Sequence, residues 1–342
     1  MGALRWHTVA WITAQTTLVP AGTPAPSGLT VHWSQPLLKS ARAAWRVSPP
    51  LAGRWVHVSS RVWTFRPSGL GWAPDTRATL TIPGGSRGPQ TLAHAYLRHT
   101  LEVSWTTPPG RTLRLQQWLA ELGYLPVIWT PASGSPPMLS WASAYQPPTG
   151  HFTWRYPAVP GPLRQLWQPG QWTVMVQGAM MHFEHHAGLA QTTDPTAAVW
   201  EALRTAVARH QAVTSGYSYA YVSETAPEQL WLWYDGTVLV HTLVNTGIPA
   251  TPTFLGTYPV YEKRAAQVMR GVAPNGVPYA DAVHWINYFW GSNAVHGFVR
   301  AAYGFPQSLG CVEVPLSVAA QIYDHLPVGG LVTVVPPGSP PL

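Results

Sequence analysis

The chain of 342 residues is long enough for two or three domains, and its composition excludes several classes of protein. Hydrophobic residues make up 46% of the chain and charged residues only 10%, a balance that is typical of a folded protein and not of a disordered one. No apolar run reaches the length of about 18 residues that spans a bilayer, so we do not expect an integral membrane protein.

The formal net charge of +7 arises from 20 Lys and Arg residues against 13 Asp and Glu residues. The basic residues are scattered and form no clustered stripe, which argues against a nucleic-acid partner. A polyanionic matrix, such as a bacterial wall, and general cationic solubility explain this charge equally well. Cys311 is the only cysteine, so an intrachain disulfide is excluded and the redox compartment stays undetermined.

The first 107 residues contain short runs of alternating apolar and polar residues, separated by clusters of turn-forming residues. This rhythm predicts an antiparallel β-sandwich. The expected strands lie at 29–33, 61–65, 78–82 and 101–105. The run at 1–22 has a single Arg and is interrupted by polar residues, so it predicts a strand better than a signal peptide.

A helical region is expected at 108–212, after a Pro-containing linker. An apolar stripe with helical spacing, which ends at Gly123, predicts a short amphipathic helix; its members are Leu113, Leu115, Trp118, Leu119 and Leu122. A Pro- and Trp-rich insertion occupies about 127–172. Asp194 as the N-cap and Pro195 as the first helical residue predict the start of a later helix.

Three histidines occur in the run HFEHH at 182–186. The order is not HExxH, and a zinc site normally needs three or four convergent ligands. We therefore interpret this run as the solvent-facing rim of a helix and expect no metal.

A third region, from residue 217 to residue 336, is rich in β-strand patterns. Asp235-Gly236 between two apolar runs is a strong signal for a two-residue β-hairpin. Further strands are expected at 283–290 and 331–335, and one helix at 316–326. The overall prediction is a multidomain, mainly β protein.

Cys311 follows Gly310 in a turn, and His296 lies fifteen positions earlier, followed by Gly297. A cysteine attacks only as the thiolate, so at neutral pH it needs a base. In a Cys-His pair the imidazole takes the thiol proton, the sulfur attacks a carbonyl, and the proton later passes to the leaving amine. Gly310 has no Cβ, which permits a tight bend and lets nearby amides stabilise an oxyanion. The alternative interpretation of Cys311 is a small buried hydrophobic residue.

The run VHWINYFWGSNAVHGFVRAAYGFPQSLGCVEVP at 283–315, with NTG at 245–247 upstream, strongly resembles the L,D-transpeptidase catalytic domain of the YkuD type. The signature of that family is His-Gly or His-Ser, a gap, and then Ser/Thr-His-Gly-Cys. His296-Gly297 and Ser308-x-Gly310-Cys311 match its order and spacing. Two positions depart from the pattern: Leu309 replaces the usual His, and Glu313 stands where the family has Arg or Asn.

This resemblance implies that Cys311 acts as nucleophile and His296 as base, with the carbonyl of Gly297 as the third member of a triad. It also implies a wall enzyme outside the cell that needs no cofactor and acts on the stem peptides and glycan of peptidoglycan. The reaction would release a terminal D-alanine and form a 3→3 cross-link. Ser308 is a candidate for orienting the loop or binding substrate, and Tyr288 and Trp285 are candidates for the substrate cleft.

Two further resemblances concern the N-terminal regions. Residues 1–107, with LTVHWSQPL, VSPPLAGRW and a later FRP, resemble bacterial Ig-like domains. LQQWLAELGYLP and the run at 176–206 resemble the two halves of a peptidoglycan-binding module, separated by the insertion. Three other functions stay open: a non-catalytic peptidoglycan-binding protein with a degenerate site, an L,D-carboxypeptidase that uses water as acceptor, and a cysteine protease that cleaves ordinary L-peptides.

Overall fold

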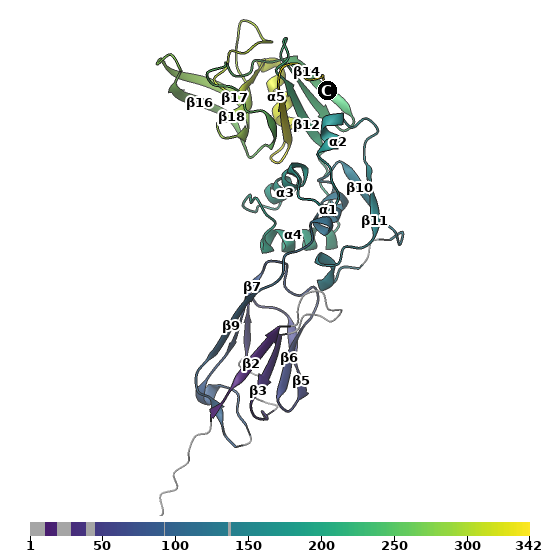
Figure 1. Ribbon diagram of the computed structural model, residues 1–342, viewed down its shortest axis with the longest axis vertical. Coiled ribbons are helices and arrows are strands. Elements are labelled where there is room, and N and C mark those ends of the chain that lie inside the picture. Colours follow the sequence, from purple (N-terminus) through teal and green to yellow (C-terminus); the bar gives the residue numbers. More distant parts are fainter. Residues whose placement is uncertain (1–10, 19–28, 39–44, 92, 136–137) are drawn as a thin grey trace, which may run out of the picture. The chain divides into compact units, whose positions relative to one another are not determined.

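A computed structural model describes residues 11–18, 29–38, 45–91, 93–135 and 138–342, and it is mainly β (Figure 1). The chain divides into two compact units. The first contains Met1–Arg114, Pro137–Pro148 and Thr196–Glu201, and the second contains Leu115–Pro136, Thr149–Pro195 and Ala202–Leu342. The predicted strand at 1–22 falls partly outside the described residues, which begin at residue 11.

The first unit contains two antiparallel sheets. The strands of the four-stranded sheet, in spatial order, are β2 (Ala14–Leu18), β3 (Leu29–Trp33), β6 (Val62–Pro67) and β5 (Gly53–Ser59). The three-stranded sheet contains β4 (Arg46–Ser48), β7 (Arg77–Ile82) and β9 (Leu101–Thr106). A short parallel pair joins β1 (Trp11–Ile12) to β8 (Tyr96–Leu97), and a 3-10 turn, η1, spans Gly85–Arg87. The four strands predicted from alternation are confirmed.

Tryptophans and aliphatic residues from both sheets form one core. Val31 and Trp63 come from the larger sheet, and Leu80 and Ile82 from the smaller one; all four are at most 1% exposed. Trp45 packs against Trp33, and the two ring centroids are 5.3 Å apart. Because successive strand residues point to opposite faces, the alternation in the sequence places these side chains together.

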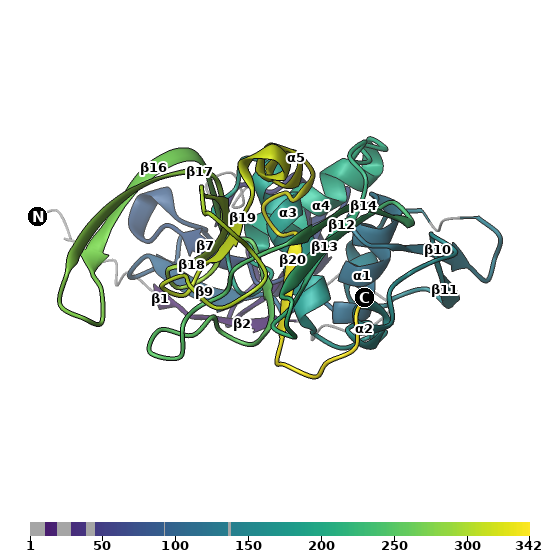
Figure 2. The ribbon, with the colours of Figure 1, turned by 90° about the horizontal axis from the view of Figure 1, so that it is seen from above.

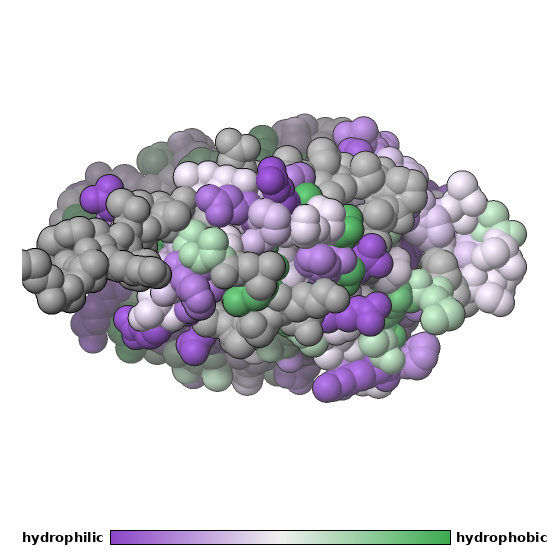
Figure 3. Space-filling model, turned by 90° about the horizontal axis from the view of Figure 1, so that it is seen from below, coloured by the Kyte–Doolittle hydropathy of each residue, from purple (hydrophilic) through white to green (hydrophobic). Residues whose placement is uncertain are grey.

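The surface seen in Figure 3 mixes hydrophilic and hydrophobic residues. The residues described on this face form no extended hydrophobic area, which agrees with the scattered distribution of charge along the chain.

A helical region follows, with two short strands inside it. Its elements are α1 (Thr112–Glu121), β10 (Val127–Pro131), η2 (Trp141–Ala144), β11 (Gly150–Trp154), α2 (Gly161–Gln165), α3 (Val174–His186) and α4 (Ala197–Ala208). Strands β10 and β11 pair antiparallel within the predicted Pro- and Trp-rich insertion. The amphipathic helix predicted before Gly123 is confirmed, and this glycine has φ +88°. Within the described residues no helix is long and apolar enough to cross a membrane.

The interpretation of HFEHH as a solvent-facing rim is wrong for His182 and Glu184. Both are buried, whereas His185 and His186 are exposed. Burial lowers the pKa of His182 to about 3, so this imidazole is neutral at physiological pH. The carboxylate of Glu184 accepts a hydrogen bond from the backbone N–H of Thr192, which satisfies it in this buried position.

The predicted N-cap of the last helix in this region is also wrong. The hydroxyl of Thr196, not the carboxylate of Asp194, accepts the N–H of Val199 at 3.4 Å. Asp194 accepts a hydrogen bond from the hydroxyl of Thr193, so its side chain is used in the preceding turn.

The third region consists of two sheets and one helix. The five-stranded sheet has the order β14 (Thr237–Leu243), β13 (Gln229–Tyr234), β12 (Ser218–Ser223), β20 (Leu331–Val335) and β15 (Gly256–Pro259). The four-stranded sheet has the order β16 (Glu262–Val272), β17 (Pro278–Trp290), β18 (Asn293–Gly297) and β19 (Val312–Val314). Helix α5 (Leu316–His325) packs against β14, β17 and β18 (Figure 2).

The hairpin predicted at Asp235-Gly236 joins β13 to β14, and both turn residues have positive φ. The strands predicted at 283–290 and 331–335 and the helix at 316–326 are likewise confirmed. Apolar side chains of both sheets and of α5 form a common core, in which Val222, Val295, Val312 and Ile322 are at most 1% exposed.

Helix α3 contacts the five-stranded sheet through two glycines. A Cβ at Gly178 would lie 2.4 Å from the carbonyl oxygen of Gly329, and a Cβ at Gly329 would lie 2.2 Å from the carbonyl oxygen of Gly178. Only glycine permits this close approach, because a backbone oxygen cannot rotate away from a methyl group.

We therefore expect Gly178→Ala to lower the free energy of unfolding by about 1–3 kcal/mol, because the gain in helix propensity does not offset the overlap. Urea denaturation measures this change. Gly161→Ala is the control, because a Cβ at Gly161 meets nothing within 4 Å. Equal stability of the two variants would contradict the close contact.

Candidate active site

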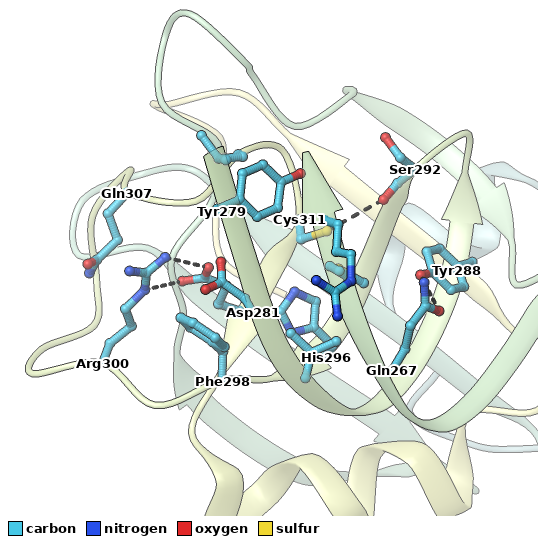
Figure 4. A pocket seen from close by; sticks show the side chains of 15 residues that line it. Gln267, Tyr279, Asp281, Tyr288, Ser292, His296, Phe298, Arg300, Gln307 and Cys311 are labelled. Atoms are coloured by element: carbon cyan, nitrogen blue, oxygen red, sulfur yellow. Dashed lines mark hydrogen bonds and ion pairs between the residues drawn. The ribbon is translucent and has the colours of Figure 1, made fainter. Parts of the chain in front are cut away.

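Strands β16 to β19 and the loops next to them enclose a pocket of about 410 Å³ (Figure 4). Cys311 and His296 both line it, together with charged, polar and apolar side chains. The other lining residues used below are Gln267, Met269, Arg270, Asp281, Val283, Tyr288, Phe298, Arg300, Leu309 and Glu313.

Cys311 lies at the end of a tight turn immediately before β19. Gly310 has φ +113°, a conformation that L-residues with a side chain rarely adopt. Ser308, which is fully buried, accepts the N–H of Gly310 at 3.1 Å and donates to the carbonyl oxygen of Cys311 at 2.6 Å. This serine therefore fixes the conformation of the turn. The N–H of Gly310 can donate to an oxyanion only after its hydrogen bond to Ser308 breaks.

The NTG run at 245–247 supports the same turn through hydrogen bonds. The backbone of Asn245 exchanges two hydrogen bonds with that of Glu313, at 2.9 and 3.0 Å. Ser308 N–H donates to the carbonyl oxygen of Thr246. The buried carboxylate of Glu228 accepts the N–H and the hydroxyl of Thr246, both at 2.7 Å. The turn that carries the thiol is therefore held by backbone contacts on both of its sides.

Cys311 is partly exposed as a residue and lines the pocket, and its Sγ lies 3.5 Å from the carbonyl oxygen of Ser292. Burial by the surrounding protein raises the pKa of this thiol to about 12, and the negative charge of Glu313 acts in the same direction. A backbone hydrogen bond from Ala294 opposes this increase in the pKa. The resting sulfur is thus a protonated thiol, and a base must remove its proton before it attacks.

His296 is 3% exposed and lies on β18, the strand next to β19. Its Nδ1 is 3.3 Å from the carbonyl oxygen of Gly297. Because a carbonyl only accepts, Nδ1 carries the hydrogen, which leaves Nε2 of the neutral imidazole as the proton acceptor. Burial lowers the pKa of His296, so the neutral form predominates at pH 7.

Parallel pairing of β18 with β19 places Val295 opposite Val312, and so brings His296 and Cys311 to one pocket. In the described part of the chain no hydrogen bond joins the two side chains, since the thiol donates to Ser292 instead. Transfer of the proton to Nε2 therefore requires the thiol to rotate away from Ser292, as is common in sites without bound substrate.

Glu313, one of the two departures from the family pattern, forms a bidentate ion pair. Arg300 donates through Nε and a terminal guanidinium nitrogen to its two oxygens, each at 2.7 Å. The side chain of Glu313 is 6% exposed and that of Arg300 30%. The charge that this position adds to the pocket is thus compensated within the pocket itself. Leu309, the other departure, lines the same pocket and is 37% exposed.

The predicted substrate residues differ in their placement. Tyr288 lines the pocket and donates from its hydroxyl to Gln267 Oε1 at 3.0 Å. Trp285 does not line the pocket; it lies at an irregularity of β17 with φ +53° and packs against the core below the sheet. Ser308 is buried, and both hydrogen bonds of its hydroxyl lie within the turn.

Three residues of the pocket were not predicted from the sequence: Asp281, Arg300 and Gln267. The signal that indicates two of them is Asn275-Gly276, a hairpin turn pair that joins β16 to β17. Register across that hairpin pairs Met269 with Asp281, and alternation then places Gln267 and Asp281 on one face. For Arg300, which lies in a loop, no local pattern indicates the contact with Glu313.

Among the described residues, no three His, Cys, Asp or Glu side chains are grouped as metal ligands. The pocket instead combines a thiol in a rigid turn with a neutral imidazole that has one free nitrogen. A thiol and an imidazole base in one pocket are the groups that acyl transfer through a cysteine requires.

Residues 218–334 match the family model of the YkuD L,D-transpeptidase catalytic domain. This segment contains both sheets of the third region and every pocket residue named above. A search of curated proteins found no match.

Several solved structures that are similar to this chain are L,D-transpeptidases. A mutant from Enterococcus faecium is 25% identical over 36% of this chain and 52% of that chain, with a TM-score of 0.32. An enzyme from Mycobacterium smegmatis is 14% identical over 96% of this chain and 100% of that chain, with a TM-score of 0.33. L,D-transpeptidase 3 from Mycobacterium tuberculosis, with a faropenem-derived adduct, is 12% identical over 91% and 92%, with a TM-score of 0.32. This chain thus spans about half the length of the Enterococcus structure.

We expect alkylation of Cys311 by iodoacetamide to be slower at pH 7 than that of free cysteine, because the raised pKa leaves little thiolate. The rate should rise about tenfold per pH unit between pH 7 and 9 without reaching a plateau. Mass spectrometry of the alkylated chain measures this profile. A plateau near pH 7 would instead indicate a preformed thiolate, and the environment described here would be wrong.

Loss of the ion pair in the pocket should destabilise the protein. Arg300→Leu leaves the carboxylate of Glu313 buried without its partner, which we expect to lower the free energy of unfolding by about 1–3 kcal/mol. Arg264→Leu breaks an exposed pair with Glu262 of the same 2.7 Å length, and should lower the stability less than Arg300→Leu does.

The double variant Arg300→Leu/Glu313→Leu removes both charges and should regain most of the stability. Urea denaturation compares the three variants. Equal effects of Arg300→Leu and Arg264→Leu would show that burial of Glu313 adds nothing to the strength of the pair.

Proposed function

We propose that the protein is a cell-wall L,D-transpeptidase that forms 3→3 peptidoglycan cross-links through an acyl-enzyme on Cys311. The observation that carries this proposal is the presence of Cys311 and His296 in one open pocket, within a segment that matches the catalytic-domain family. The substrates would be peptidoglycan stem peptides, and the site of action the cell wall outside the cell. The wall-binding role of the Ig-like and peptidoglycan-binding-like regions belongs to the same proposal.

In the first half-reaction, Nε2 of His296 takes the thiol proton while the sulfur attacks the carbonyl of the third residue of a tetrapeptide stem. The carbonyl–nitrogen bond then breaks, the proton passes from His296 to the leaving nitrogen, and D-alanine departs. The bond between Nδ1 of His296 and Gly297 keeps the imidazole in the tautomer that this step needs.

In the second half-reaction an unprotonated amine attacks the thioester. His296 takes a proton from that nitrogen, the carbon–sulfur bond breaks, and the proton returns to the sulfur of Cys311. Water can replace the amine in the same steps, and the product is then a hydrolysed tripeptide. The two outcomes share one acyl-enzyme, so their ratio measures the choice of acceptor.

Incubation with a disaccharide-tetrapeptide, followed by mass spectrometry, tests the proposal. We expect the protein to release alanine from the substrate and to carry a transient covalent adduct. Cys311→Ala should abolish both products, and His296→Ala should lower the rate by about 10²–10⁴-fold. His241→Ala is the control, because this exposed imidazole bonds to Gln229 and does not line the pocket.

A non-catalytic peptidoglycan-binding protein would give a different result. It would retain the disaccharide-tetrapeptide intact, with no alanine released and no adduct on Cys311. Exclusive formation of tripeptide would identify an L,D-carboxypeptidase.

A further inference from the structure

Four charged side chains line the pocket, and two of them neutralise each other. Arg300 and Glu313 form the bidentate pair, with both oxygens of the carboxylate occupied at 2.7 Å. The side chains of Asp281 and Arg270 form no hydrogen bond or ion pair with the described residues. Among the described pocket residues, Asp281 is therefore the carboxylate whose oxygens are available to a ligand, and its charge acts on Arg300 only through space, where it raises the pKa of that guanidinium.

The register of the β16–β17 hairpin explains why Asp281 faces the pocket. Met269 lies opposite Asp281 and Gln267 lies opposite Val283, so these four side chains share one face of the hairpin. Arg270 directly follows Met269 on β16, so its Cβ points to the opposite face of the hairpin. Figure 4 shows Asp281 on the pocket side of β17, between the labelled Arg300 and His296 in that view.

Apolar side chains line the same pocket as this carboxylate. Met269 is its cross-strand neighbour, Val283 is two residues along β17, and Phe298 follows the strand that carries His296. An aliphatic chain fits against such side chains, and a positive group at its end fits against a carboxylate. The negative charge of Asp281 also acts on His296, since it raises the pKa of that imidazole against the effect of burial.

We infer that Asp281 binds the ammonium group of the acceptor in the second half-reaction. The inference rests on the proposed function and adds to it the residue that selects the amine over water. An acceptor that also carries a carboxylate would meet Arg270. Asp281 attracts the ammonium form, which predominates at neutral pH, and so raises the local concentration of acceptor at the thioester.

The proton balance of this step is complete. The ammonium bound by Asp281 releases one proton to solvent and becomes the amine that attacks the thioester. The second proton passes through His296 to the sulfur of Cys311 as the carbon–sulfur bond breaks. Water needs no ammonium site, so hydrolysis proceeds without the help of Asp281.

The ratio of aminolysis to hydrolysis tests this inference, because both reactions start from one acyl-enzyme and a change in acylation cancels. The donor is the disaccharide-tetrapeptide, and the acceptor is a disaccharide-tripeptide with a diamino acid at its end, below saturation. Asp281→Asn should lower the ratio about tenfold, through an increased KM for the acceptor. Asp281→Glu, which keeps the charge, should lower it by less than about threefold.

Glu262→Gln is the matched control, because Glu262 is a carboxylate on the same hairpin but outside the pocket. The ratio of aminolysis to hydrolysis for Glu262→Gln should equal that of the wild type. Added salt should lower the ratio of the wild type towards that of Asp281→Asn, and should leave that variant nearly unchanged. A purely structural role of Asp281 would not produce this dependence on salt.

Three results would overturn the inference. An Asp281→Asn ratio within twofold of the wild type shows that the carboxylate does not select the amine. A wild-type acyl-enzyme that only hydrolyses shows that no amine is accepted, while the chemistry of Cys311 stands. Absence of any acyl-enzyme, checked without acceptor, removes the proposed function and this inference with it.

Discussion

Parallel pairing between β18 and β19 is the constraint on which the rest of the site depends. It places the strand that carries His296 beside the strand that begins immediately after Cys311, although fifteen positions separate the two residues. The turn before β19 is then fixed by Ser308 and by the backbone of Asn245 and Thr246. A catalytic pair needs fixed positions, and here the backbone hydrogen bonds between strands and the hydroxyl of Ser308 supply this rigidity together.

Burial sets the protonation states of the pair, and it acts on both in the direction of the neutral form. It raises the pKa of Cys311 and lowers that of His296, so thiol and imidazole coexist at neutral pH in place of a thiolate–imidazolium pair. In the proposed reaction, transfer of the thiol proton therefore accompanies the attack of the sulfur. The same low-polarity surroundings explain why Glu313 needs a bidentate partner, since an unpaired carboxylate there would be costly.

The two departures from the family signature have different consequences in the structure. Glu313 changes the sign of a charge, but Arg300 compensates it, and the pair occupies one side of the pocket. Leu309 adds an apolar, partly exposed group where the family has an imidazole. Together they leave His296 as the imidazole beside the thiol, and Asp281 as the carboxylate open to a ligand among the described pocket residues.

Several local elements, and the candidate pair Cys311 and His296, could be predicted from the sequence alone. Alternation predicted β3, β6, β7 and β9, and the Asp235-Gly236 turn predicted a hairpin, because these features depend on neighbouring residues alone. Spacing and composition similarly indicated Cys311 and His296. Only the tertiary structure decided that His182 is buried, that Trp285 packs into the core, and that Arg300 neutralises Glu313. These outcomes depend on which distant segments meet, and the pattern along a single strand or helix carries no information about the partner that covers it.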